Sequence, residues 1–176
     1  KSISLFVLSG ILFGLGFYTY IPFRFAPVLA LVVFAPLLFS SNSKKLWIGI
    51  SLFILTVFIV AAPIGWHFLK NPADFFGRSS EVSVFSQNAP VKALAVSVIS
   101  TLGMFNIVGD FNWRHNFAGA PELFFPVGLL FLLGLWLSAK RFSFGDKFLF
   151  AWLFIFLLPT FLSTEGNPHA LRAIGV

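Results

Sequence analysis

Long runs of apolar residues, separated by short polar stretches, form the main pattern along this chain. Five runs approach the roughly 20 residues that a helix needs to cross the hydrocarbon core of a bilayer, and none has a charged residue in its interior. Within each run, apolar residues occupy every face of the expected helix, as is typical of helices surrounded by lipid. The pattern therefore predicts five membrane-crossing helices, at about residues 3–20, 25–40, 46–64, 123–139 and 148–163.

A more polar region, residues 65–122, separates the third run from the fourth. It contains a moderately apolar stretch, residues 91–108, which is interrupted by Ser97, Ser100, Thr101 and Asn106. Two interpretations are open for this stretch, namely a sixth crossing or a helix that lies in the membrane interface.

The distribution of charged residues favours the interfacial helix. With the start of the chain in the cytoplasm and five crossings, the inner side has six basic residues and one acidic residue, and the outer side has six basic and five acidic. This arrangement follows the tendency of basic residues to stay on the cytoplasmic side. A sixth crossing would move the basic loop at residues 140–147 outside. We therefore expect residues 65–122 to be extracytoplasmic, with an interfacial or re-entrant helix at 91–108.

The composition agrees with a membrane protein. Of the 176 residues, 58% are hydrophobic and only 10% are charged, against about 25% charged in ordinary soluble domains. The net charge of +6 then indicates cytoplasmic loops and contacts with lipid head groups rather than a nucleic-acid partner. We expect residues 1–176 to form one all-α transmembrane domain of a longer, multi-pass protein of the cytoplasmic (inner) membrane, with its functional face outward.

Candidate binding residues collect on the predicted outer side, in four clusters at residues 18–24, 71–78, 109–116 and 165–172. Each cluster combines at least one arginine with proline, glycine, asparagine or histidine. A guanidinium group can bind two oxygens of a phosphate at once, so arginine at a membrane surface suits a lipid-linked phosphate. The candidate substrate-binding residues are Arg172, His169, Arg24, Arg114, His115 and Arg78.

Structural explanations of the same residues remain open. Arg24 can anchor a helix end at the interface, and Asp110 and Arg114 can pair if their segment is helical.

The absence of cysteine excludes disulfides and thiolate metal sites. The histidines have no metal-ligand spacing, so we expect no metal site and see no evident cofactor. A divalent metal remains possible only if folding brings Asp110 and His115, or Glu165 and His169, together.

Four segments resemble bacterial membrane glycosyltransferases of the dolichyl-phosphate-mannose–protein mannosyltransferase and aminoarabinose lipid A transferase superfamily. They are Gly-Leu-Gly-Phe-Tyr-Thr-Tyr-x-Pro-Phe-Arg at 14–24, Asn-Pro-x-Asp-Phe-Phe-Gly-Arg from 71 extending to 85, Gly-Asp-x-Asn-x-Arg-His-Asn at 109–116, and Pro-His-Ala-Leu-Arg at 168–172. The resemblance implies a polytopic GT-C helical bundle with an outward active site. It also implies a sugar donor linked to polyprenyl phosphate, and a catalytic acid in a loop upstream of this chain.

The expected function is therefore transfer of a sugar from a polyprenyl-phosphate donor to an acceptor on the outer face. A transporter or flippase of a lipid-linked or anionic substrate is the alternative. Transporters often have broken helices and polar residues near the membrane midplane, whereas the apolar runs here have uncharged interiors. We expect Arg172, with His169 beside it, to line the donor-phosphate site at the outer end of the fifth run.

Overall fold

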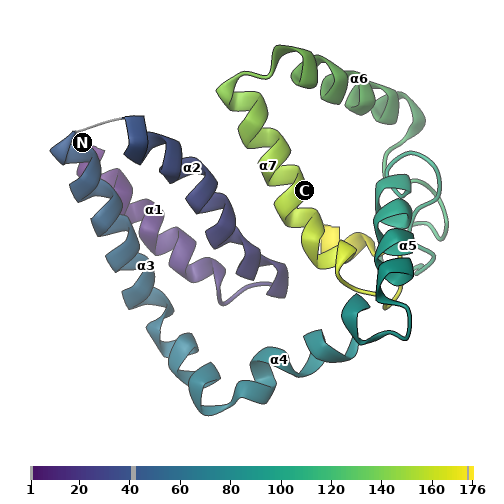
Figure 1. Ribbon diagram of the computed structural model, residues 1–176, viewed down its shortest axis with the longest axis horizontal. Coiled ribbons are helices and arrows are strands. Elements are labelled where there is room, and N and C mark those ends of the chain that lie inside the picture. The colour runs from purple at the N-terminus through teal and green to yellow at the C-terminus, as the bar shows by residue number, and fades with distance from the viewer. Residues whose placement is uncertain (1, 41–42, 174) are drawn as a thin grey trace. The chain divides into compact units, whose positions relative to one another are not determined.

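The computed structural model describes residues 2–40, 43–173 and 175–176, with side chains for all of these except 2, 38, 40 and 78–80. The secondary structure of the described residues is helical, apart from one isolated antiparallel bridge between Ser83 and Ser163. The all-α prediction is therefore confirmed for these residues. The helices, drawn in Figure 1, are α1 (Ser2–Gly16), η1 (Ile21–Phe25), α2 (Ala26–Ser40), α3 (Lys44–Lys70), α4 (Pro72–Glu81), η2 (Val84–Ser86), α5 (Pro90–Gly103), α6 (Phe125–Arg141), α7 (Phe144–Phe161) and η3 (Ala170–Ala173).

Each of the five predicted apolar runs coincides with a helix, namely α1, α2, α3, α6 and α7. Two of them, α3 with 27 residues and α7 with 18, are long and apolar enough to cross a membrane. At 1.5 Å per residue they extend about 40 Å and 27 Å. The first run is shorter as a helix than its sequence suggested, because α1 ends at Gly16 and a turn leads into η1. Five crossings thus remain a prediction.

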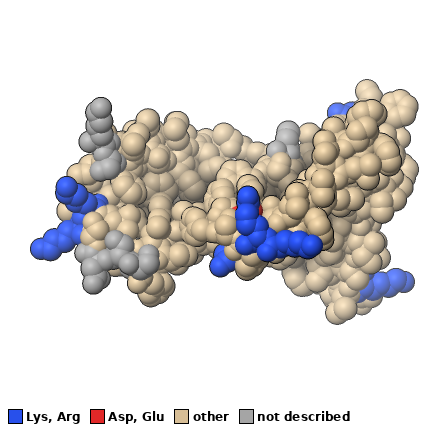
Figure 2. All heavy atoms as spheres, turned by 90° about the horizontal axis from the view of Figure 1, so that it is seen from above, with Lys and Arg blue, Asp and Glu red and all other residues tan. Residues whose placement is uncertain are grey.

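Large apolar side chains are exposed along the longest helix. On α3, Phe58 is 71% exposed, Ile59 65% and Leu55 56%. Figure 2 shows Lys and Arg side chains in several separate places on the face in view, with almost no Asp or Glu visible. Exposed apolar surface of this extent is typical of helices that contact lipid or another apolar surface.

The chain divides into two compact units, Lys1–Gly77 and Arg78–Val176. In the first unit, α1 packs along α3 through two glycines one helical turn apart. A Cβ atom at Gly10 would lie 2.8 Å from the carbonyl oxygen of Phe53, and one at Gly14 would lie 2.7 Å from the Cβ of Val60. Small residues four apart allow such close approach of two backbones, as in many membrane helix pairs.

The second unit is built around α7. Its core joins Met104, which follows α5, to Leu157 and Phe161 of α7 and to Ala173 of η3. The hydroxyl group of Ser97, which is fully buried on α5, donates to the carbonyl oxygen of Thr160 at 2.9 Å and to that of Ser163 at 3.0 Å. These bonds hold α5 against the C-terminal end of α7.

The loop between α6 and α7 is fixed by a buried carboxylate. Asp146 accepts hydrogen bonds from Nε of Arg141 at 2.8 Å and Nη2 of Arg141 at 2.5 Å. It also forms a capping box with Ser143 at the start of α7. The loop that precedes α6, residues 104–124, lies at the N-terminal end of α6. There the backbone N–H of Leu123 donates to the carbonyl oxygen of Phe105. The basic residues 140–147 and the polar loop 104–124 therefore lie at opposite ends of α6.

Both segments that flank α5 return to the C-terminal end of α7. Before α5, the backbone N–H of Val84 donates to Leu162 at 3.0 Å, and that of Thr164 donates to Val82 at 2.8 Å. After α5, the chain packs on Phe161 and Ala173. α5 has 14 residues, about 21 Å, which is short of the roughly 30 Å of a hydrocarbon core. Because α1 and α2, with 15 residues each, are hardly longer than α5, the expectation that α5 does not span the membrane stays a prediction.

Candidate functional site

Two loops of the second unit meet beyond the C-terminal end of α7, namely residues 104–124 between α5 and α6, and residues 162–169 between α7 and η3. The first, residues 104–124, closes on itself because the N–H of Gly119 donates to the carbonyl oxygen of Asp110 at 2.9 Å, and the N–H of Gly109 donates to that of Gly119 at 3.3 Å. Gly119 has φ of +79°, a left-handed conformation that favours glycine. At Gly109 the backbone of Ala120 approaches so closely that a Cβ would lie 2.0 Å from its oxygen. These two glycines shape the loop that presents Asp110.

Asp110 is the central hydrogen-bond acceptor between the two loops. Its side chain accepts from the N–H of Asn112 at 2.8 Å and, across 60 residues of sequence, from the N–H of Ala170 at 3.0 Å. Its Oδ2 also lies 2.6 Å from Nδ1 of His115. Burial acts to raise the pKa of Asp110, but these hydrogen bonds outweigh burial and leave the pKa below its usual value. Asp110 is therefore a buried, ionised carboxylate.

Two histidines from the two loops stack beside this carboxylate. The rings of His115 and His169 are nearly parallel, at 24°, with centroids 4.7 Å apart. Nδ1 of His169 is buried and has no hydrogen-bond partner among the described residues. Burial lowers the pKa of His169, and the positive charge of Arg172 lowers it further, so this imidazole is neutral at pH 7. The cluster thus combines one carboxylate with two imidazoles.

Arg172 lies in η3 and holds the second loop closed. Its Nη1 donates to the carbonyl oxygen of Glu165 at 2.7 Å and to the hydroxyl group of Ser163, and its Nη2 donates to the Glu165 carboxylate at 2.7 Å. The side chain of Arg172 is 14% exposed, whereas that of Glu165 is 49% exposed. The guanidinium group is thus already bound to one anion, and that anion is accessible to solvent.

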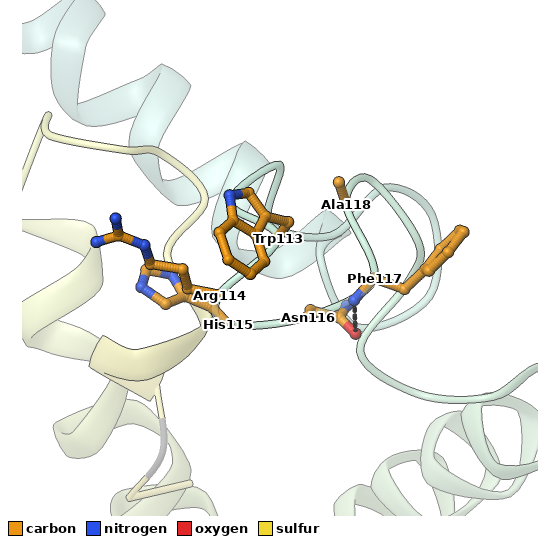
Figure 3. A pocket seen from close by; sticks show the side chains of 6 residues that line it. All are labelled: Trp113, Arg114, His115, Asn116, Phe117 and Ala118. Atoms are coloured by element: carbon orange, nitrogen blue, oxygen red, sulfur yellow. Dashed lines mark hydrogen bonds between the residues drawn. The ribbon is translucent and has the colours of Figure 1, made fainter.

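A surface pocket of about 500 Å³ opens beside the cluster, lined by Trp113, Arg114, His115, Asn116, Phe117 and Ala118. Figure 3 shows that the side chains of Arg114 and His115 extend in the same direction, away from Phe117. Arg114 is exposed, and its guanidinium carbon lies 5.9 Å from the ring centroid of Trp113. Because His115 lines the pocket and contacts Asp110 as well, a molecule in the pocket lies next to the cluster.

Arg24, a candidate in the first unit, has a different environment. Its Nη1 donates to the carbonyl oxygen of Phe75 at 2.8 Å, and its guanidinium carbon lies 5.0 Å and 4.2 Å from the rings of Phe68 and Phe75. These contacts join the first of the four sequence clusters to the second. The side chain of Arg78, another candidate, lies outside the described residues.

Of the six candidate residues, the fold brings His115 and His169 into contact, and the charge of Arg172 acts on His169. Arg114 directly precedes His115 in sequence. The considered helical pair of Asp110 and Arg114 is not the arrangement observed, because residues 109–116 form a loop and the carboxylate contacts His115. Asp110 was not among the six candidate substrate-binding residues, although the sequence left it open as a metal ligand together with His115. The available signal was the Asp-x-Asn pattern, since an aspartate that accepts from the N–H two residues later forms an Asx turn.

Comparison with protein-family models, curated proteins and solved structures found no match for this chain. The glycosyltransferase resemblance of the four motifs therefore remains a prediction. What the fold adds is that these motifs meet in pairs, the first with the second through Arg24 and the third with the fourth through Asp110.

Proposed function

We propose that the protein is a multi-pass glycosyltransferase of the cytoplasmic membrane. It uses a sugar linked to polyprenyl phosphate at the outer face. The observation that carries this proposal is the contact between the third and fourth motifs, which are 60 residues apart in sequence. Asp110 accepts a hydrogen bond from Ala170, and His115 stacks on His169, at the end of the apolar helix α7. Polar residues gathered at one end of an apolar helix suit a substrate whose charged group lies at the interface and whose tail lies in lipid.

The arrangement of the second unit supports an outward position for this cluster. The basic loop at residues 140–147 lies at the N-terminal end of α7, and the cluster lies beyond its C-terminal end. Basic loops tend to remain in the cytoplasm, and α7 is long and apolar enough to cross a membrane. With residues 140–147 inside, Asp110 and Arg172 face outward. This orientation is the one that an externally acting glycosyltransferase needs.

Arg172 is the proposed phosphate-binding residue. In this structure Arg172 binds the half-exposed carboxylate of Glu165. A phosphate group presents two oxygens to a guanidinium group much as a carboxylate does. We infer that the donor phosphate replaces Glu165 at Arg172, with Arg114, which lines the adjacent pocket, as a second cation. A fixed positive charge there stabilises the negative charge that develops on the leaving phosphate.

The proposed reaction breaks the bond between the anomeric carbon of the sugar and the phosphate oxygen. A new bond forms between that carbon and a hydroxyl oxygen of the acceptor. The acceptor proton passes to a carboxylate base, and polyprenyl phosphate leaves with the bonding electrons. No residue described here is assigned as this base, and the proposed role of the described residues is donor binding and leaving-group stabilisation.

The test is turnover of a radiolabelled polyprenyl-phosphate hexose by the full protein in proteoliposomes. Loss of a hydrogen bond to a charged group costs about 1.5–3 kcal/mol, so Arg172→Ala should lower kcat/KM roughly ten- to a hundredfold. Arg172→Lys should lose less, and His169→Ala less again. Lys140→Ala, at the opposite end of α7, serves as the control with unchanged turnover.

Glu165→Gln separates phosphate binding from a purely structural role of Arg172. If Arg172 receives the phosphate, removal of the competing carboxylate should lower the KM for the donor. If Arg172 only closes the loop, Glu165→Gln and Arg172→Ala should both lower stability and leave the KM unchanged. Wild-type turnover and donor affinity in Arg172→Ala would refute the assignment and make Arg24 or Arg114 the better candidate. Transfer of intact donor across the bilayer, without release of polyprenyl phosphate, would favour the transporter instead.

A further inference from the structure

We propose that Asp110, His115 and His169 form a binding site for a divalent transition-metal ion of the zinc class. One ligand-type atom from each of these three residues lies within 4.8 Å of the other two. The spacing of the histidines along the chain did not predict a metal site, because the ligands come from two loops that meet only in the folded second unit. This site does not depend on the proposed sugar transfer.

The geometry is close to that of a metal-bound set. Zinc binds carboxylate oxygen and imidazole nitrogen at about 2.0–2.2 Å, which places tetrahedral ligand atoms about 3.4 Å apart. The ligand atoms lie within 4.8 Å of one another, so no separation must close by more than about 1.4 Å, and the 2.6 Å between Nδ1 of His115 and Oδ2 of Asp110 must open by about 0.8 Å. Rotations of the two imidazole rings can supply movements of this size.

An orphaned polar atom points independently to a ligand. Nδ1 of His169 is buried without a hydrogen-bond partner among the described residues. An unsatisfied buried nitrogen is unfavourable, and nearly all such groups in proteins have a partner. A metal ion at the cluster provides that partner. Asp110 contributes the negative charge that a buried cation requires, and its side chain is only 4% exposed.

The remaining surroundings suit a site with an open position. The Asp110 carboxylate is oriented by the N–H groups of Asn112 and Ala170, and such supporting bonds are typical around metal ligands. Two imidazoles with one carboxylate hold zinc or iron in many proteins and leave a position for water or substrate. His115 also lines the adjacent pocket, so an open position there is accessible to an anionic ligand.

The test measures zinc bound to the full protein after treatment with a chelator, reloading and dialysis, by elemental analysis. Wild type should retain one equivalent of Zn²⁺, and added Zn²⁺ should raise its melting midpoint. Mg²⁺ should not raise it, because Mg²⁺ prefers oxygen ligands. His115→Gln and His169→Gln should each lower zinc affinity more than about 100-fold, since loss of a merely supporting group already costs 10- to 100-fold.

His67→Gln is the matched control. His67 also pairs with an aspartate, at 2.9 Å from Asp74, but it lies in the first unit and its side chain is 55% exposed. This variant should bind zinc as wild type does. The proposal is overturned if wild type retains well below one equivalent, if Mg²⁺ raises the midpoint as Zn²⁺ does, or if His67→Gln loses as much zinc as His169→Gln. If a glutamine variant fails to fold, the comparison of Zn²⁺ with Mg²⁺ on the wild-type protein still tests whether a zinc site is present.

Discussion

The closest backbone approach in the candidate site makes Gly109→Ala a demanding test of the loop that holds Asp110. A Cβ at this position would lie 2.0 Å from the carbonyl oxygen of Ala120, whereas real Cβ atoms essentially never come within 3.0 Å of another heavy atom. The backbone must therefore move by at least about 1 Å, and overpacking of this kind typically costs about 1–3 kcal/mol. Because Asp110 is the next residue, its contacts with His115 and Ala170 should be displaced as well.

The assay compares Gly109→Ala with Gly103→Ala by thermal unfolding in detergent and by zinc affinity. A Cβ at Gly103 would meet nothing within 4 Å, so the control should be neutral or gain up to about 1 kcal/mol through loss of unfolded-state entropy. Gly109→Ala should melt roughly 2–12 °C lower than wild type and bind zinc more weakly. Equal melting points and equal zinc affinities for the two variants would refute the described loop geometry.

Three further predictions concern stability and are measured by thermal unfolding in the same detergent. Ser97→Ala should lose about 1 kcal/mol, because the buried hydroxyl group bonds two carbonyl oxygens at the end of α7; an unchanged midpoint would argue against these bonds. Gly14→Ala should lose about 1–3 kcal/mol by separating α1 from α3, whereas Gly65→Ala, with nothing near its Cβ, should not. Arg24→Met should lose about 1–3 kcal/mol through its hydrogen bond and ring contacts, and no loss would leave Arg24 available as a substrate-binding residue.

Five of the helices, α1, α2, α3, α6 and α7, could be predicted from the sequence because each coincides with a long apolar run, whereas α4 (Pro72–Glu81) is polar and was not predicted as one. The ends of the helices were less predictable. The first run continues to Tyr20 in hydropathy, but α1 ends at Gly16, where Phe23 of η1 packs so closely that a Cβ would lie 2.2 Å from its ring. The packing of Gly10 and Gly14 on α3 was also missed, since the hydropathy of a run does not identify the face that a neighbouring helix covers.

The sequence singled out several residues of the candidate site as candidates, and their role in substrate binding stays a prediction, but the sequence did not show how they are organised. His115, His169 and Arg172 were selected because they stand in polar clusters near the ends of apolar runs. Their contacts depend on Asp110, which hydrogen-bonds a backbone N–H 60 residues away. Such long-range pairing depends on how α5 and α7 pack, and neither spacing nor composition contains that information. The partner of Arg172 is Glu165, seven residues earlier in the same loop, a contact that the turn at Gly166 makes possible.

Binding of polyprenyl phosphate to the purified full protein tests the central claim most directly. Native mass spectrometry should detect one polyprenyl phosphate bound to wild type, with much weaker binding of the uncharged polyprenol of the same length. The affinity for polyprenyl phosphate should fall roughly ten- to a hundredfold in Arg172→Ala and be unchanged in Lys140→Ala. Equal affinity for polyprenol and polyprenyl phosphate, or for wild type and Arg172→Ala, would contradict recognition of a lipid-linked phosphate at this site.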